Sequence, residues 1–350
     1  FRRVLFRSLT ITKLAWRDLV PDSESYQDVF AQPDLAKEHE FILSDTQPRL
    51  HYALEQVLSP WATAPFMLLK APEEAEYLTL IGDAVRQLQP ESNAVFGGQY
   101  RIAGHDVTFE PSTQADDRFA AKGEVITANW VEAEQLFGCL RQFNGELSLQ
   151  PGLVHRANGG VLIISLRTLL SQPLLWMRLK TIVNQQRFDW VGYDESRPLP
   201  VAVPSMPLSL TVVLTGDRES LADFQEMEPE LAEQAVYSEY EDNIQIADAD
   251  DMTQWCQWVM TVAERFALPA PAADAWPGLM REAVRYTGDQ ETLPLCPLWI
   301  SKQLREVGVI SGNGTFTGEQ LAQMLAQREW REGYLADRMQ DEILLEQKIG

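Results

Sequence analysis

The segment RANGGVLIISLRTLLSQPLLW, from Arg156 to Trp176, decides the fold class. Its centre, Val161-Leu162-Ile163-Ile164, is a run of branched apolar residues behind a Gly-Gly pair, which is typical of a strand buried on both faces. The strand ends in Ser165-Leu166, and an amphipathic helix follows in QPLLWMRLKTIVNQQ. The segment therefore predicts a central strand of an α/β sheet.

Other segments repeat this alternation of strand and helix. PFMLLKAPEEAEYLTLIGDAVRQL predicts a short strand over 66–69, a loop, and a helix over 74–88. LSLTVVLTGD predicts a second buried strand that ends in Gly216-Asp217. We also expect a hairpin in QYRIAGHDVTFEPS and a helix in WVEAEQLFGCLRQF. Together these elements predict a parallel sheet with helices on both faces.

From about Thr253 the pattern changes to four helical segments separated by Pro- and Gly-bearing turns, which predicts a small all-helical domain. We expect residues 1–8, FRRVLFRS, to be a foreign leader, because they carry three arginines and no initiating Met. The periodicity of the next residues is helical. The domains expected from these patterns are a helical segment over 9–60, an α/β domain over 61–250, a helical domain over 251–330 and a further helix over 331–350.

Composition limits the partners. The chain has 350 residues and a formal net charge of −22, which argues against a surface for nucleic acid or anionic membranes. We therefore expect proteins or small molecules as partners. Cys139, Cys256 and Cys296 lack the spacing of a metal site or a disulfide framework, and we interpret all three as buried thiols. With no signal peptide and no apolar stretch long enough to span a membrane, the sequence predicts a cytoplasmic protein.

Four segments carry a resemblance to a known family. They are GLVHRANGGVLIISLRTLLSQPLLWMRLKTIV, LTVVLTGDRE, YTGDQETLPL and REWREGYLADRMQDEILLEQ. As a set they resemble the Walker B block, the sensor-1 strand, the helical lid and the connecting helix of the Lon family of ATP-dependent serine proteases, in its bacterial branch with a divergent AAA+ module. The resemblance implies an AAA+-like P-loop parallel sheet flanked by helices, followed by the lid.

The resemblance also implies a ring-forming homo-oligomer, protein substrates, and ATP with Mg²⁺ as cofactor. The family's proteolytic Ser and Lys would lie beyond Gly350, so we expect the sequence to be a fragment without a catalytic residue. In agreement, the sequence contains no G-x-S-x-G motif and no recognisable Ser, His and Asp set.

The family's phosphate-binding loop would fall on KAPEEAEY, which comprises Lys70, Ala71, Pro72, Glu73, Glu74, Ala75, Glu76 and Tyr77. Such a loop needs glycines, a Lys for the phosphates and a hydroxyl for Mg²⁺. The resemblance puts Lys70, Glu73 and Ala75 in glycine positions, Glu76 in the lysine position and Tyr77 in the hydroxyl position. We infer that the carboxylates occupy the anion site themselves. Alternatively, these residues are an acidic first turn of an ordinary helix.

Two further requirements for ATP hydrolysis are unmet in the sequence. Ser165 stands where Asp would hold the metal, and Leu166 where Glu would polarise water, so we expect no metal site. The segment from Glu219 to Glu264 contains no Lys or Arg that could serve as an arginine finger. The sensor-like residues that remain are Gly216, Asp217, Arg218, Arg281 and Arg285.

Three hypotheses for function follow. The first is a degenerate AAA+ module that acts as an oligomerising, substrate-gating scaffold for a protease. The second is a module that binds or slowly hydrolyses ATP through unorthodox ligands, for which Lys70, Arg281 and Arg285 are the available cations. The third is an acidic interaction protein whose 219–264 region binds a basic partner.

Overall fold

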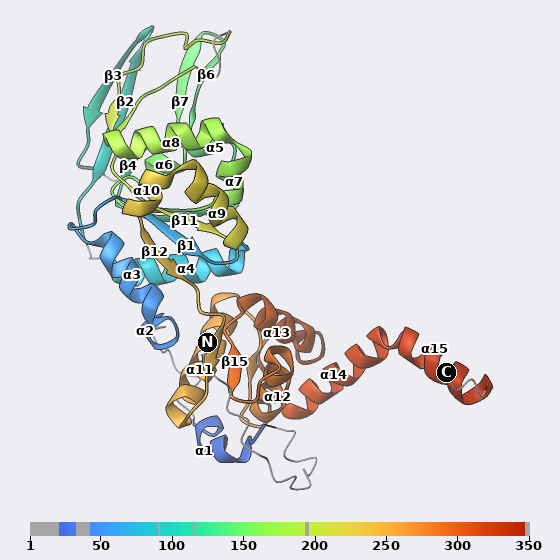
Figure 1. Ribbon diagram of the computed structural model, residues 1–350. Coiled ribbons are helices and arrows are strands. Elements are labelled where there is room, and N and C mark those ends of the chain that lie inside the picture. The colour runs from blue at the N-terminus through green and yellow to red at the C-terminus, as the bar shows by residue number, and fades with distance from the viewer. Residues whose placement is uncertain (1–20, 33–42, 90–91, 115–116, 193–195, 347–350) are drawn as a thin grey trace. The chain divides into compact units, whose positions relative to one another are not determined.

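The computed structural model describes residues 21–32, 43–89, 92–114, 117–192 and 196–346. The chain divides into two compact units, residues 42–240 and residues 241–350, and the second unit includes the N-terminal segment up to residue 41 (Figure 1). The leader predicted at 1–8 lies outside the described residues. The domain boundaries drawn from sequence composition stay predictions.

A five-stranded sheet forms the centre of the 42–240 unit. Its strand order is β12-β1-β11-β8-β5, and every neighbouring pair is parallel. The strands are β1 (Phe66–Lys70), β5 (Val125–Ala128), β8 (Val161–Ser165), β11 (Thr211–Gly216) and β12 (Val236–Glu239). The segment Val161 to Ser165 is buried at every position, as its apolar run predicts.

Helices cover both faces of this sheet (Figure 1). One face packs against α3 (Pro48–Leu58) and α4 (Ala75–Leu88), with α2 (Leu43–Thr46) beside α3. The helices of the other face are α7 (Leu166–Ser171), α8 (Pro173–Gln185), α9 (Arg218–Met227) and α10 (Pro229–Gln234). The predicted parallel sheet with flanking helices is therefore confirmed.

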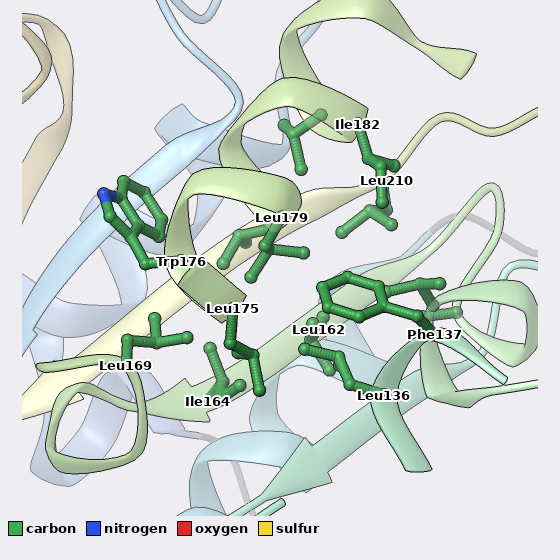
Figure 2. Close-up of a cluster of buried hydrophobic side chains, with 14 of the residues drawn as sticks. Leu136, Phe137, Leu162, Ile164, Leu169, Leu175, Trp176, Leu179, Ile182 and Leu210 are labelled. Atoms are coloured by element: carbon green, nitrogen blue, oxygen red, sulfur yellow. The ribbon is translucent and has the colours of Figure 1, made fainter. Parts of the chain in front are cut away.

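The core between the sheet and α8 is built from two periodicities. Leu162 and Ile164 are two residues apart on β8 and so point to the same face of the sheet. Leu175 and Leu179 lie one turn apart on α8 and point toward the sheet, and all four side chains are buried (Figure 2). Trp176, on the same helix, packs edge to face against Phe66 and Phe224. Truncation of Trp176 to Ala would remove these packing contacts and leave a cavity, so we expect it to lower the free energy of unfolding by about 3–5 kcal/mol.

Insertions between the sheet strands form smaller antiparallel elements. β2 (Phe96–Ala103) and β3 (Asp106–Pro111) form the predicted hairpin and pair with β4 (Phe119–Ala121). The helix predicted over 130–143 is wrong beyond Phe137, because Gly138 has φ 73° and ends α5 (Ala133–Phe137). A second hairpin follows, formed by β6 (Cys139–Phe143) and β7 (Glu146–Gln150). The remaining short elements are α6 (Leu153–Arg156), β9 (Arg187–Phe188) and β10 (Met206–Pro207).

The second unit is helical, as predicted. Its helices are α1 (Gln27–Phe30) after the 3-10 turn η2 (Glu24–Tyr26), then α11 (Ala249–Arg265), α12 (Trp276–Thr287), α13 (Pro297–Ser311), α14 (Gly318–Glu332) and α15 (Tyr334–Glu346). Two short strand pairs join them, β13 (Asn243–Gln245) with β15 (Thr292–Pro294) and β14 (Ala270–Pro271) with β16 (Thr315–Phe316). The sequence pattern gave no sign of these pairs.

Asp248 caps α11 by accepting hydrogen bonds from the backbone N–H groups of Asp250 and Asp251, and Trp255 on the same helix is fully buried. The prediction for the cysteines has a clear outcome. Cys256 is buried, but Cys139 and Cys296 are partly exposed, so the prediction of three buried thiols is wrong for these two. None of the three forms a disulfide.

Candidate functional site

The carboxyl ends of the sheet strands bring most of the predicted site residues together. Lys70, the last residue of β1, lies opposite Gly216 on β11 and opposite Glu239 on β12. Ser165, the last residue of β8, lies opposite Thr215. Open parallel sheets bind ligands at this edge, beside the point where the strand order reverses. Here that point is β1, because the chain leaves β1 for the far edge at β5 and later returns to its other side at β12.

Glu73 is the buried charged group at this edge. Only 6% of the residue is exposed, and its carboxylate links two segments that are 92 residues apart in the chain. The Ser165 hydroxyl donates to Oε1 over 2.6 Å, and the backbone N–H of Arg167 donates to the same oxygen over 3.1 Å. The Arg167 guanidinium lies 3.1 Å from Oε2. The loop after β1 therefore places a carboxylate in hydrogen-bond contact with the end of β8.

The loop itself is short and has no left-handed residue. Ala71 donates its N–H to the Gly216 carbonyl over 3.1 Å, which continues the pairing of β1 with β11 for one residue. Pro72 follows, and Glu74 stands in extended conformation at the N-cap of α4 without a side-chain hydrogen bond. None of residues 70–77 has a positive φ, so the loop does not form the nest of N–H groups that wraps a phosphate.

Two further residues of the predicted loop, Lys70 and Tyr77, have their partners outside the loop. Lys70 is paired with Glu239, whose Oε2 lies 2.9 Å from Nζ. The hydrogen bonds from Lys70 and from the Tyr237 hydroxyl lower the pKa of the Glu239 carboxyl. Tyr77 is buried, and its ring meets that of Tyr240 edge to face at 5.1 Å between centroids. Tyr77, which the resemblance put in the position of the Mg²⁺-binding hydroxyl, is therefore part of the packing beside β12.

The three other residues of the predicted loop lie in the first turn of α4 or just before it. Glu74 and Ala75 are exposed, and Glu76 is half-buried. Carboxylates are favourable at this end of a helix, because the N-terminal N–H groups carry partial positive charge. The alternative interpretation as an acidic first turn therefore describes Glu74 and Glu76 well, whereas Glu73 is set apart by its burial and its partners.

The predicted Walker B and sensor-1 positions pack against each other. Leu166 is fully buried at the start of α7, and a side chain at Gly216 would bring its Cβ within 3.0 Å of the Leu166 Cδ1. Glycine at 216 therefore permits the close approach of α7 to β11. A carboxylate at position 166 would be buried at this contact, which is occupied by an apolar side chain instead.

Asp217 and Arg218 begin α9. The Asp217 carboxylate caps the helix by accepting the Ser220 N–H over 2.8 Å, and this hydrogen bond lowers the pKa of the carboxyl, with a smaller effect from the Arg167 charge. The charge of Arg218 in turn lowers the pKa of Glu239 slightly. Arg218 thus faces the Lys70–Glu239 pair across the ends of β11, β1 and β12.

Comparison with known proteins agrees with this architecture. The LonB-like AAA domain family matches residues 122–235, which include β8, β11 and the Ser165 position. The chain contains a LonB-like AAA domain. It is 66% identical over 97% of its length to the "Putative Lon protease homolog" of Escherichia coli (strain K12), and 32% identical over 81% of its length to the protein of the same description from Haemophilus influenzae.

These matches confirm the resemblance to the Lon family that the sequence predicted. The chain spans 58% of the Escherichia coli protein and 49% of the Haemophilus influenzae protein, so about half of each relative has no counterpart in it. Among solved structures, NtrX from Brucella abortus in complex with ADP is 12% identical, with 82% of this chain and 54% of that one aligned at a TM-score of 0.44.

The sensor-like arginines predicted in the lid lie on α12, in the unit that does not contain the LonB-like AAA domain. The Arg285 guanidinium lies 3.0 Å from the Glu282 carboxylate one turn earlier. Arg281 donates from Nε to the Pro277 carbonyl over 3.4 Å. Both arginines thus have partners on their own helix.

One residue of the site, Arg167, was not predicted from the sequence. Arg167 follows the predicted Walker B position directly, yet its role depends on Glu73, 94 residues away in the chain. The only signal was its place immediately after a buried strand.

Within the described ranges, no group of three or more His, Cys, Asp and Glu side chains could hold a metal ion. No described helix is both long and apolar enough to cross a bilayer.

Proposed function

We propose that this chain is the AAA+-like module of a Lon-type ATP-dependent serine protease homologue, and that it acts as an oligomerising and substrate-gating scaffold with weak or absent ATPase activity. The observation that carries the proposal is the position of the Glu73 carboxylate. It accepts the Ser165 hydroxyl and the Arg167 N–H at the edge of the sheet where a nucleotide phosphate would need such donors.

The residues at this edge do not fit a triphosphate with Mg²⁺. A phosphate group within about 4 Å of the Glu73 carboxylate would be repelled by roughly 4 kcal/mol at moderate dielectric. Lys70, the nearest lysine in the loop, is held by Glu239. The end of β8 offers Ser165 and Leu166, neither of which is a carboxylate that could hold the metal. We therefore derive no catalytic step from a nucleotide.

Exposed apolar residues support a role as scaffold. Trp61 is 92% exposed in the loop before β1, and aromatic side chains are enriched at protein interfaces. On α15 the large apolar side chains Tyr334, Leu335, Met339, Ile343 and Leu344 are all exposed. Such surfaces are typical of contacts with other copies or domains. Protein substrates, a homo-oligomeric ring and a cytoplasmic location are part of this proposal.

Mass photometry of the longer protein that contains this chain, together with an ATPase assay, tests the proposal. We expect the protein to assemble into the same oligomer with and without ATP and Mg²⁺, and to turn over ATP no faster than its Glu73→Lys variant. Trp61→Ser should weaken the assembly, whereas Phe143→Ser, at a hairpin position that is 77% exposed, should not. A protein that stays monomeric, or that assembles only with ATP, contradicts the proposal.

A further inference from the structure

A cavity lies at the amino end of β1, at the opposite end of that strand from Lys70. Its volume is about 390 Å³, within the range of small-ligand pockets. The wall comes from the start of β1, the second half of α8, the end of α9 and α10. All of these elements belong to the 42–240 unit, and the cavity is separate from the candidate site at the carboxyl edge of the sheet.

One part of the cavity wall is apolar. Phe66 and Leu231 are buried, at 1% and 9% exposure, so they lie at the closed side of the cavity. Met227 is 43% exposed and lies at its mouth. Ala64 and Pro229 complete this part of the wall. Such a wall can pack against the methylene groups of a long side chain whose charged end stays at the polar part.

Three charged residues line the cavity, and two of them are already paired with each other. The Lys180 Nζ lies 2.5 Å from Oε2 of Glu228, and the Trp176 Nε1–H donates to Oε1 of Glu228 over 2.9 Å. Burial raises the pKa of the Glu228 carboxyl, but the hydrogen bonds from Lys180 and Trp176 outweigh it and lower that pKa overall. The charges of Lys180 and Glu228 therefore balance inside the wall.

The third charged residue, Glu230, has no such partner. Among the described residues, none forms an ion pair or a side-chain hydrogen bond with its carboxylate. The side-chain amides of Asn184 and Gln234 also line the cavity and likewise have no hydrogen-bond partner in the described part of the chain. The polar part of the wall therefore has one unused carboxylate and two unused amide oxygens as acceptors.

A guanidinium group fits this set of acceptors. It has five N–H donors and no acceptor, in a planar fork that can reach a carboxylate and an amide oxygen at the same time. Its three methylene groups suit the apolar part of the wall. An ammonium group is a compact, strongly hydrated charge that does not use a fork of acceptors.

The surface beside the cavity has the charge that such a ligand needs. Glu226 on α9 and Glu233 on α10 are exposed, and the sequence from 219 to 264 contains no Lys or Arg. A negative surface of this kind favours the approach of a positively charged segment of another protein.

We infer that this cavity binds an arginine side chain of a partner protein, with the guanidinium on the Glu230 carboxylate and the Gln234 amide oxygen, and the methylene groups against Phe66 and Leu231. The inference concerns binding alone and does not rest on the proposed function, since it needs neither nucleotide nor assembly.

Isothermal titration with the blocked peptide acetyl-Ala-Ala-Arg-Ala-Ala-amide tests the inference, with the lysine and citrulline analogues as further probes. We expect the arginine peptide to bind with a dissociation constant below about 1 mM. The citrulline peptide has the same shape without the charge and should bind at least about 10-fold more weakly. No saturable heat with the arginine peptide, or equal affinity for the arginine peptide and either analogue, would overturn the inference.

Two exposed positions on α10 separate the cavity from the acidic surface around it. Glu230→Gln removes the unused carboxylate of the wall and should weaken binding of the arginine peptide at least about 10-fold. Glu233→Gln removes an equal charge that does not line the cavity and should change the affinity less than about 2-fold. Equal weakening by both variants would assign the binding to the acidic surface as a whole and overturn the inference.

Sedimentation velocity of the same variants tests a second copy of this chain as the occupant. We expect Glu230→Gln to leave the oligomeric state of the unaltered chain unchanged. A loss of self-association in Glu230→Gln but not in Glu233→Gln would assign the cavity to a contact between copies and contradict the inference.

Discussion

Glu73 at the carboxyl edge of the sheet and Arg178 on α8 are satisfied in different ways. At the sheet edge the Glu73 carboxylate is 6% exposed and accepts hydrogen bonds from Ser165 and Arg167. The half-buried Arg178 guanidinium lies against the rings of Phe137 and Phe188 and donates to the backbone carbonyl of Asp189, whose charge offsets part of the effect of burial on the pKa of Arg178.

The comparison shows two ways to keep a charged group in a poorly solvated place. The sheet edge is where α/β sheets bind ligands, yet the Glu73 carboxylate there already has donors from the end of β8 and the start of α7. The partners of Arg178 are aromatic rings and the backbone and charge of Asp189, eleven residues later in the chain. Glu73 therefore connects two distant segments through hydrogen bonds, whereas Arg178 contributes mainly packing.

Removing Glu73 should have the largest effect on stability. In Glu73→Ala the Ser165 hydroxyl and the Arg167 N–H lose their acceptor in a place that water hardly reaches, which should lower the free energy of unfolding by about 3 kcal/mol. Urea denaturation measures this change. Glu74→Ala removes an exposed carboxylate one residue later and should stay within about 0.5 kcal/mol. Equal effects of the two substitutions would mean that the Glu73 contacts do not hold the loop to β8.

The buried side chain of His155 should make stability depend on pH. His155 accepts the Gly152 N–H at Nδ1, and its ring stacks on Trp190. Burial, with a smaller effect from the Arg178 charge, lowers the pKa of His155 to about 3.

Because the pKa of His155 is lowered by folding, there is a pH range in which the unfolded chain binds a proton at His155 and the folded chain does not. The stability linked to His155 is complete above pH 6.5 and is lost as the pH falls towards 3. Between pH 6.5 and pH 5 this loss should amount to about 2 kcal/mol. Denaturation curves at both pH values should show a smaller loss in His155→Gln. An unchanged loss in that variant would show that His155 becomes protonated in the folded protein.

Replacing Arg178 should affect stability much less than replacing Glu73. Arg178→Met keeps an unbranched side chain against Phe137 and removes a half-buried charge that the Asp189 carboxylate offsets only in part, so the loss of one hydrogen bond is balanced by the lower desolvation cost. The free energy of unfolding should change by less than about 1 kcal/mol. A loss comparable to that of Glu73→Ala, measured in the same urea series, would remove the contrast between the two regions.

The smallest effect is expected at the helix cap of the sheet edge. Asp217→Ala removes the acceptor for the Ser220 N–H and should cost about 1 kcal/mol at pH 7. Since the pKa of Asp217 is lowered in the folded protein, the difference from the unaltered protein should shrink as the pH falls below 3.8. Asp223→Ala, on the exposed surface of the same helix, serves as the control. A difference that does not shrink at all between pH 5 and pH 3 would assign the effect to packing.

The sequence was sufficient for the elements whose pattern is local. The apolar run from Val161 predicted a buried strand, and the periodicity from Thr253 predicted a helical unit. The β6–β7 hairpin was missed although Asn144-Gly145, with φ of 50° and 84°, is a strong turn signal, because the apolar spacing before it is also compatible with a helix. Gly138 decides between the two by ending α5.

The sequence predicted which positions form the site, but not which side chains contact one another there. The acidic loop suggested that carboxylates replace phosphates, but Glu74 and Glu76 resemble Glu73 in sequence and differ from it only in burial. The partnership of Glu73 with Ser165 and Arg167 joins residues more than 90 positions apart, and such a contact has no local pattern. The place of Arg178 between the rings of Phe137 and Phe188 likewise has no local sequence pattern.

Isothermal titration of the purified protein with ATP in the presence of Mg²⁺ tests the central claim most directly, which is that the Glu73 carboxylate takes the place of a phosphate. We expect no saturable heat up to about 1 mM ATP, which corresponds to a binding free energy weaker than about −4 kcal/mol. Binding with a micromolar dissociation constant, lost in a Lys70→Ala variant, would contradict the account.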